Sequence, residues 1–367
     1  MRFSRRANWS PALNAFTTAR EQRRRRGEHF LDLTISNPTQ AGLDYPLDEL
    51  AEALARGARA AYDPQPLGIR AAREAVATQI GCDADDIVIT ASTSEAYSFL
   101  FKLLCDAGDN VLTATPSYPL LEHLAALEQI ELRTLALELH RRWELHADRV
   151  RAAMTPRTGA VVIVNPNNPT GSYVRSEEQD ALASVGVPIV SDEVFFEYAA
   201  DGAGAPRVVR DDVLAFSLDG LSKSCGLPHY KLGWIRVSGP EKRRAMDALE
   251  LIADNFLSVS TPVQQALPDL LRIGARIRDM IRARIRQNLE TLRRAMSPAM
   301  TLLPVEGGWS AVLRMPRTHD DLAMAMLDRG VIVHPGYFFD FDGDGYIVVS
   351  LLTPLETFAD GLKRIVR

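Results

Sequence analysis

The sequence predicts an α/β protein: a three-layer fold with a mostly parallel central sheet, joined to a second, smaller α+β unit. Short apolar stretches alternate with helix-like stretches between about residues 45 and 240, as the strands and crossover helices of a parallel sheet do. Each apolar stretch is about four to six residues long, which is typical of fully buried parallel strands. At 367 residues the chain can bury more than one core, so we expect two domains.

The chain begins with a basic arm, residues 1–30, in which the pattern predicts a helix. Ser10 can cap this helix, and Pro11 suits its first turn. Near its end, Arg23–Arg26 place four like charges in a row. We interpret them as a solvated helix end or as a strip against a partner subunit. A contact with nucleic acid is the weaker alternative, because the net charge of −5 gives no global basic field.

The central region contains candidate strands that share an apolar, partly β-branched composition. They are Ile87–Thr90, Asn110–Thr113, Ala160–Val164, Ile189–Ser191, Val213–Leu218 and Gly233–Val237. Helix-like stretches such as Ser94–Cys105 and Ser176–Val185 lie between them. This alternation predicts one parallel sheet with helices on its faces.

A long helical pattern then runs in pieces from about Pro240 to about Met296. The elements expected after it are a strand near Ser310–Arg314, a helix near His319–Arg329, strands near Val331 and Ile347, and a last helix from Pro354. We therefore divide the chain into three parts. Residues 1–44 form an arm that contributes to the small domain and to a dimer, residues 45–250 form the large domain, and residues 251–367 form the small domain.

The composition argues against several classes of protein. No apolar run approaches the length of a membrane-spanning helix, and the N-terminus has no apolar signal core. The three cysteines (Cys82, Cys105 and Cys225) have no metal-ligand spacing, which predicts reduced thiols in a cytoplasmic protein. The seven histidines form no i, i+4 pair, so we expect no metal. The two Gly-rich nucleotide-binding motifs, G-x-G-x-x-G and G-x-x-x-x-G-K-[ST], are both absent from the sequence, which argues against a nucleotide-dependent dehydrogenase or kinase.

Three side chains with useful chemistry lie at or just beyond the ends of these strands: Asn165, Asp192 and Lys223. In an open parallel sheet, ligands bind beyond the carboxyl ends of the strands, so we expect the three to meet. A lysine beside an amide and a carboxylate suits a Schiff-base nucleophile that holds an aldehyde cofactor. The strand Ile87–Thr90 runs into the polar turn Ala91–Ala96, which opens a helix.

Free amides at such a helix start bind phosphate, and the hydroxyls of Thr93 and Ser94 can add to them. A simple helix cap explains the same residues equally well. Cys225 is interpreted as a packed thiol and His334, before Pro335 and Gly336, as a structural histidine.

Two motifs carry a resemblance that covers nearly the whole chain. Asn-Pro-Asn-Asn-Pro-Thr-Gly (residues 165–171) is the more specific, and Ser222-Lys223 followed by Gly-Leu-Pro is the second. With these motifs the chain resembles fold-type I pyridoxal-phosphate enzymes of the class I/II aminotransferase family. The resemblance implies pyridoxal 5'-phosphate as cofactor, and an amino donor and a 2-oxo acid acceptor as substrates.

The resemblance also implies roles for single residues. Lys223 would form the Schiff base and move protons at the substrate's α-carbon, Asp192 would pair with the protonated pyridine nitrogen, and Asn165 would contact the phenolic oxygen. Tyr118 would stack on the ring, and Tyr62 would reach the phosphate in the neighbouring subunit of a homodimer. Phosphate contacts would come from Thr93, Ser94, Ser222 and Lys231.

Three cofactor contacts depart from the family's pattern. Lys231 stands where the family has an arginine, so a forked grip becomes a point contact. Gly220 stands where a phosphate-binding hydroxyl is usual. Phe195 replaces a tyrosine that bonds the phenolic oxygen, so we predict altered protonation of the bound cofactor.

A fourth departure concerns the substrate. Val348 occupies the position of the arginine that clamps the α-carboxylate in relatives. Either another cation has taken over, with Arg314 as a candidate, or the substrate is not an ordinary α-amino acid. The sequence thus favours an aminotransferase. A lyase, decarboxylase or oxidase on the same scaffold, and a non-catalytic ligand-binding protein, are the alternatives.

Overall fold

The computed structural model describes residues 4, 6, 14–200, 202–316 and 319–366. Within them, seven strands form the central sheet, and β10 alone runs against the direction of its neighbours. In spatial order the strands are β2 (Ile87–Thr90), β10 (Gly233–Ser238), β9 (Ala215–Gly220), β8 (Ile189–Asp192), β7 (Thr158–Val164), β3 (Asn110–Thr115) and β4 (Glu131–Ala136). The predicted mostly parallel sheet is confirmed.

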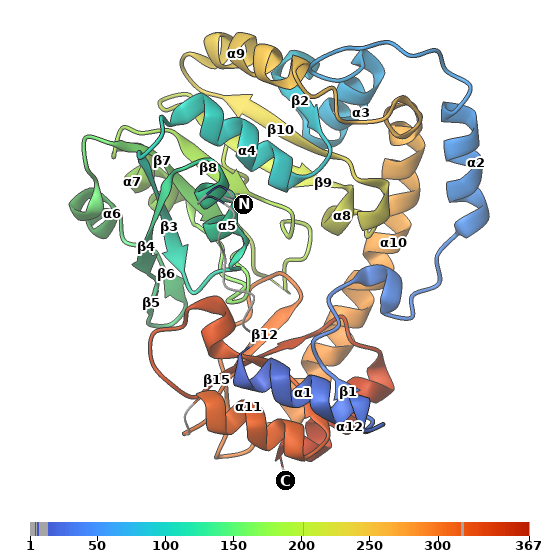
Figure 1. Ribbon diagram of the computed structural model, residues 1–367, viewed down its shortest axis with the longest axis vertical. Helices are drawn as coiled ribbons and strands as arrows, with labels where there is room; N and C mark the ends of the chain where they lie inside the picture. The colour runs from blue at the N-terminus through green and yellow to red at the C-terminus, as the bar shows by residue number, and fades with distance from the viewer. Residues whose placement is uncertain (1–3, 5, 7–13, 201, 317–318, 367) are drawn as a thin grey trace.

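Helices cover both faces of this sheet, because its strands are apolar on both sides. Val190 and Phe216 pack on one face, which is covered by α4 (Thr93–Leu104), α5 (Leu120–Leu127) and α9 (Lys242–Asp254). Ile189 and Ala215, their neighbours in the chain, point to the other face, toward α6 (Ala147–Ala153) and α7 (Ser176–Ala183). Helix, sheet and helix therefore form the three predicted layers (Figure 1).

The remaining strands lie mostly in a second unit, at the lower end of Figure 1. Its four-stranded sheet has the order β11 (Thr301–Leu302), β12 (Ser310–Arg314), β15 (Tyr346–Ser350) and β14 (His334–Pro335). β1 (Leu31–Asp32) pairs in parallel with β13 (Val331–Ile332), and β5 (Glu138–Leu139) pairs with β6 (Trp143–Glu144). The helices α11 (His319–Asp328) and α12 (Leu355–Val366) complete this end of the chain.

The N-terminal segment packs against the second unit, although some three hundred residues separate them in the sequence. Helix α1 (Ala15–Arg25) lies beside α11 (Figure 1). Asn14 caps α1, because its Oδ1 accepts a hydrogen bond from the Thr17 amide at 2.7 Å. The predicted cap residues, Ser10 and Pro11, lie outside the described residues. Arg23 forms an ion pair with Asp328 of α11, so at least part of the arginine run holds this helix in place.

Helix α10 (Thr261–Arg294) runs along both units. It contacts α2 (Leu47–Gly57) and α3 (Arg70–Ile80) near its start and α12 further on (Figure 1). The short helices are α8 (Leu221–Ser224) and the 3₁₀ turns η2 (Pro38–Gln40), η3 (Ala84–Asp86), η4 (Pro228–Tyr230) and η5 (Gly336–Phe339). The domain boundary expected near residue 250 falls inside α9 and stays a prediction. Among the described helices, none is both long and apolar enough to cross a membrane.

Candidate active site

A cavity of about 380 Å³ lies beyond the carboxyl ends of β7, β8 and β9. Both units line it: Asp192 and Lys223 come from the central sheet, and Ser310, His334 and Val348 come from the second unit. A larger, more open groove of about 730 Å³ runs along α10, but it contains neither Lys223 nor Asp192. The smaller cavity is therefore the candidate site.

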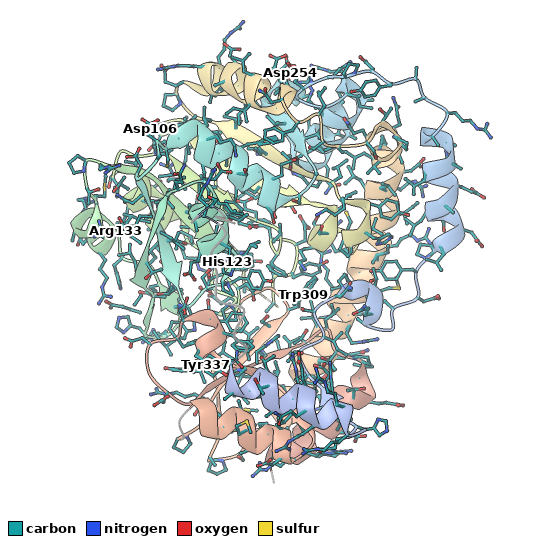
Figure 2. All side chains as sticks on the ribbon, viewed as in Figure 1. Asp106, His123, Arg133, Asp254, Trp309 and Tyr337 are labelled. Atoms are coloured by element: carbon teal, nitrogen blue, oxygen red, sulfur yellow. The ribbon has the colours of Figure 1, made fainter. Side chains whose placement is uncertain are left out.

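Lys223 reaches the cavity from the single turn of α8, which directly follows β9. Its Nζ lies 5.1 Å from the centre of the Trp309 ring. Trp309 itself lies between the two units (Figure 2). Burial lowers the pKa of this amine, and the Asp192 charge opposes that shift only in part. The backbone carbonyl of Lys223 accepts a hydrogen bond from the Tyr198 hydroxyl at 2.6 Å, which fixes the turn.

Close packing against α10 fixes the same turn from behind. Cys225 is fully buried, and a side chain at Gly274 of α10 would meet its Cβ at 2.4 Å. Burial raises the pKa of the Cys225 thiol to about 12. Cys225 is thus a packed thiol, as the sequence indicated.

Asp192 ends β8 and borders the cavity. Its two oxygens accept hydrogen bonds from the Val194 amide, at 3.2 Å, and from the Tyr97 hydroxyl, at 3.0 Å. Burial raises the pKa of this carboxyl to about 6, while both hydrogen bonds and Lys223 act in the opposite direction. Among the described residues, Lys223 is the one cation that acts on this carboxyl, and its effect is the smallest of those named here. A positively charged ring nitrogen would supply a stronger partner.

The other end of the cavity gathers several hydrogen-bond donors. Thr93 and Ser94 form the first turn of α4 and line the cavity with free helix amides. Ser92 caps the helix, with its Oγ accepting from the Glu95 amide at 3.2 Å. Ser222 and Lys231 line the cavity as well. Amides, hydroxyls and an ammonium group form a donor set that fits a phosphate dianion.

The close approach of the neighbouring strand explains why residue 220 is a glycine. A Cβ at this position would meet the Gly233 Cα at 2.8 Å and the Leu232 carbonyl oxygen at 2.9 Å. β9 and β10 leave no room for the hydroxyl-bearing side chain that the family usually has here.

Asn165 is not among the described residues that line the cavity. Its side chain is fully buried, and its Oδ1 accepts a hydrogen bond from the Val174 amide at 3.0 Å instead of facing the cavity. Asn168, three residues further along the same motif, lines the cavity, and its Oδ1 accepts from the Ser310 hydroxyl at 3.2 Å. We therefore propose that Asn168, in place of Asn165, contacts the phenolic oxygen of the cofactor.

The two predicted tyrosines occupy different places. Tyr118 lines the cavity and is 52 % exposed, which leaves its ring free to cover a ligand. Tyr62 does not line this cavity, and it is 71 % exposed. A residue that serves a neighbouring subunit's site would have these properties.

The departures from the family's pattern shape the cavity wall. Phe195 packs edge-on against Trp309, with ring centres 4.9 Å apart. Val348 lines the cavity and is buried. The suggested replacement of the missing arginine by Arg314 is wrong, because Arg314 is exposed at the end of β12 and lies over the Tyr346 ring at 5.3 Å.

The lining residues that were not predicted from the sequence include Asn168, Tyr97 and His334. Tyr97 lies one helical turn after Thr93, a spacing that could have placed it on the cavity side of α4. His334 lines the cavity, and burial lowers its pKa to about 4, so it is neutral near pH 7. Its position beside Pro335 and Gly336 gave no comparable signal.

The comparisons with known proteins agree with this site. The family described as "Aminotransferase class I and II" matches residues 28–362. Nicotianamine aminotransferase 1 of Oryza sativa subsp. japonica is 31% identical over 241 residues, 61% of this chain and 49% of that protein. Glutamate-pyruvate aminotransferase AlaA of Escherichia coli K12 is 27% identical over 259 residues, 67% of this chain and 64% of that protein. The chain thus spans about half to two thirds of these relatives.

Solved structures show the same fold. The alanine aminotransferase from Pyrococcus furiosus superposes with a TM-score of 0.87 at 22% identity, over 100% of this chain and 98% of that one. The tyrosine aminotransferase from Leishmania infantum gives a TM-score of 0.83 at 21% identity, over 98% of both chains. At such identities they support the architecture alone. Given the family match over most of its length, the chain belongs to the aminotransferase class I and II family, whose cofactor is pyridoxal 5'-phosphate.

Proposed function

We propose that this protein is an aminotransferase that moves an amino group between an amino acid or amine and a 2-oxo acid. The observation that carries this proposal is the convergence of Lys223 and Asp192 on one cavity, with the start of α4 at its other end. The names of the relatives, nicotianamine and glutamate-pyruvate aminotransferases, describe reactions of the same type.

Pyridoxal phosphate, when bound, supplies an electron sink that weakens the bonds at the substrate's α-carbon. The Lys223 amine would hold the cofactor and then accept and return the proton at that carbon. Its lowered pKa suits both tasks, since it leaves more of the amine neutral near pH 7. The Asp192 carboxylate would keep a proton on the ring nitrogen, because its charge favours the protonated form.

The other cavity residues would position the cofactor. Thr93, Ser94, Ser222 and Lys231 offer donors to the phosphate. The amide nitrogen of Asn168 would donate to the phenolic oxygen, with its Oδ1 held by Ser310. Tyr118 and Trp309 would exclude water from the ring faces.

The substrate end of the cavity has no guanidinium group among the described lining residues. Its polar groups include Ser310, Asn168 and the neutral His334, and Thr34, Ser36 and Ser350 line the cavity as well. The charge of Arg20 in α1 helps to lower the pKa of His334, but Arg20 does not line the cavity. We therefore infer that the amino donor is recognised without an arginine clamp on an α-carboxylate.

We also propose a homodimer in which Tyr62 contacts the cofactor in the partner's site. In support of this, Tyr62 is exposed and does not line the cavity of its own subunit. Size measurement in solution, with Tyr62→Phe weakening cofactor retention, tests this assignment. A cytoplasmic location is proposed as well, and it is supported by the three free thiols (Cys82, Cys105 and Cys225).

A half-reaction tests the proposed activity. Purified protein loaded with pyridoxal phosphate receives one amino donor at a time, without a 2-oxo acid. We expect one equivalent of oxo product per subunit, and further turnover only after a 2-oxo acid is added. Lys223→Ala should abolish this reaction. Lys242→Ala should not, because Lys242 is an exposed residue paired with Asp86 at 2.8 Å.

Two results would overturn the proposal. Repeated turnover that releases ammonia or carbon dioxide would assign a lyase or a decarboxylase instead. Failure to retain the cofactor would remove the enzyme assignment altogether.

A further inference from the structure

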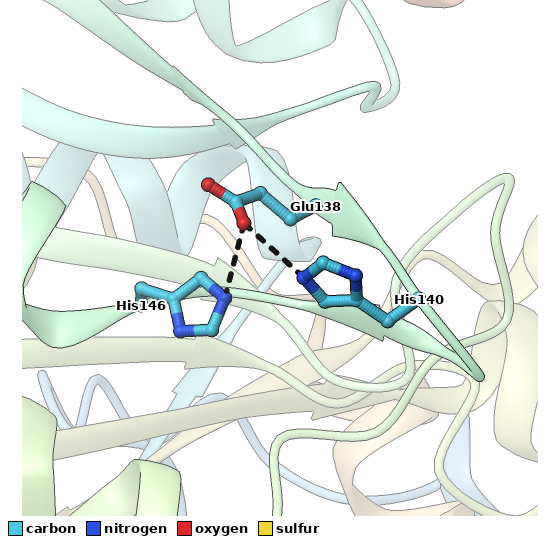
Figure 3. A group of neighbouring side chains, drawn as sticks. All are labelled: Glu138, His140 and His146. Atoms are coloured by element: carbon cyan, nitrogen blue, oxygen red, sulfur yellow. Dashed lines mark ion pairs between the residues drawn. The ribbon is translucent and has the colours of Figure 1, made fainter.

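A group of potential metal ligands lies on the hairpin formed by β5 and β6, away from the candidate active site. The side chains of Glu138, His140 and His146 converge there (Figure 3). Glu138 begins β5, His140 directly follows that strand, and His146 lies two residues past the end of β6. Glu138 pairs with Glu144 across the hairpin, so the two strands bring the three residues together.

The two distances between the carboxylate and the imidazoles suit a metal ion. Glu138 Oε2 lies 3.3 Å from His140 Nε2 and 3.4 Å from His146 Nε2. All three ligand atoms lie within 4.8 Å of one another. Tetrahedral zinc with bonds of about 2.0–2.1 Å separates its ligand atoms by roughly 3.3–3.4 Å. The observed separations exceed the common N–H···O hydrogen-bond length of about 2.7–3.2 Å.

The carboxylate is oriented by a neighbouring cation. Arg149 of α6 forms an ion pair with the other oxygen of Glu138, Oε1. This contact leaves Oε2 directed toward the two imidazoles. Groups that lie behind a metal ligand often orient it in this way. The arginine charge also opposes a bound cation, so we expect moderate affinity. His140 and His146 are partly exposed, with side-chain exposures of 63% and 43%, which gives an ion access from solvent.

We propose that Glu138 Oε2, His140 Nε2 and His146 Nε2 bind a divalent transition-metal ion, with Zn²⁺ as the first candidate and water in the fourth position. Two imidazoles and one carboxylate match the preference of this ion for nitrogen and oxygen donors. None of the three residues lines the candidate active site. The ion would therefore act on structure and would take no part in the reaction.

The hairpin connects this group to the cavity wall. Trp143 of β6 is buried, and its ring packs edge-on against Phe341 at 6.0 Å. Both belong to a core cluster that also contains Phe339 and Val348, which line the cavity. A bound ion would cross-link the hairpin and so stabilise it against the second unit.

Metal titration of the holoprotein, free of any histidine tag and of unbound cofactor, tests this site. Co²⁺ is added first, because its visible absorption reports coordination, and Zn²⁺ then competes with it. We expect one equivalent per subunit and a higher melting temperature with Zn²⁺. His140→Ala, His146→Ala and Glu138→Gln should each weaken binding at least about tenfold.

His29→Ala serves as the matched control, because His29 is exposed and remote in sequence from the hairpin. It should leave binding unchanged, and circular dichroism of each variant verifies that it is folded. Unchanged affinity in folded His140→Ala and His146→Ala proteins would overturn the proposal. Absence of Co²⁺ or Zn²⁺ binding at millimolar concentration would overturn it as well.

Discussion

Tyr97 donates a hydrogen bond to Oδ2 of Asp192 across 3.0 Å. Tyr97 belongs to α4, the helix whose first turn carries Thr93 and Ser94. One helix thus supplies the anion-binding end of the cavity and also orients the carboxylate at its other end. The two ends of the proposed cofactor site are therefore connected through the first turn of α4, from Thr93 to Tyr97.

Removing the Tyr97 hydroxyl should shift the pH dependence of cofactor binding. The hydrogen bond favours the charged form of Asp192, so Tyr97→Phe should raise the pKa of that carboxyl above about 6. A hydrogen bond worth about 1 kcal/mol corresponds to roughly 0.7 pH unit. Cofactor affinity is measured from pH 5 to pH 8. It should rise with pH in the wild type, and in the variant the same rise should occur at a higher pH.

Tyr173→Phe is the control, because the Tyr173 hydroxyl donates to the Phe196 carbonyl at 2.9 Å, whereas the hydroxyl bonded to the Asp192 carboxylate is that of Tyr97. It should leave the profile unchanged. Identical profiles for Tyr97→Phe and the wild type would show that the hydroxyl does not tune Asp192.

Asp192→Asn should stabilise the cofactor-free protein while it abolishes activity. The folded-state pKa of about 6 lies above the ordinary aspartate value of 3.8, so the folded protein binds more protons than the unfolded chain between these pH values. The contribution of this group to stability therefore falls as the pH rises from about 4 to about 6, and stays low above it. A shift of this size corresponds to roughly 3 kcal/mol at pH 7, an upper bound.

Thermal melts of the cofactor-free proteins between pH 4 and pH 8 test this expectation. The variant's advantage should be small at pH 4 and should grow to its full size above pH 6. An advantage that is equal at all pH values would contradict the titration of Asp192 as its cause.

Much of the fold could be predicted because buried parallel strands leave a local signal. Ile87–Thr90 was predicted with the bounds of β2, and Ser310–Arg314 with those of β12. β4 was missed because Glu131–Ala136 lies at the sheet edge, where its half-exposed residues include Glu131 and Arg133 and form no apolar run. Pairing of β1 with β13 depends on a contact between distant segments, which no local pattern encodes.

The site could be predicted only to within a few residues. The motif located the loop after β7, but the choice between Asn165 and Asn168 depends on how that loop turns. The closeness of β9 to β10, which explains Gly220, is likewise a property of tertiary packing. Lys223 and Asp192 converge as expected because strand ends of a parallel sheet meet at one edge.

Arg207→Met should destabilise the protein strongly. The Arg207 guanidinium pairs with Glu193 at 2.8 Å and with Asp219 at 3.4 Å, and both carboxylates are almost fully buried. Removing one partner of a buried pair costs about 3–5 kcal/mol, because it leaves uncompensated charge. Glu193 and Asp219 directly neighbour Asp192 and Gly220, so cofactor retention should fall as well. Urea unfolding of the cofactor-free protein measures the free energy.

Arg210→Met is the matched control for this change. Arg210 also pairs with two carboxylates, Asp180 and Asp212, but these are 69% and 51% exposed. Its loss should cost about 1 kcal/mol or less. Equal costs for the two variants would mean that burial of Glu193 and Asp219 contributes nothing.

Val348→Arg should move the donor preference toward amino acids that carry an α-carboxylate. Val348 lines the substrate end of the cavity, where the described residues offer no guanidinium. A charge-assisted pair is worth about 1.5–3 kcal/mol, so the ratio of kcat/KM for an amino acid over the amine without its carboxyl group should rise about tenfold or more. The buried position means that stability will fall, and Val348→Met therefore controls for size.

Arg20→Met should leave the ratio unchanged. A fall in that ratio for Arg20→Met would instead identify Arg20 as the carboxylate partner and refute recognition without an arginine.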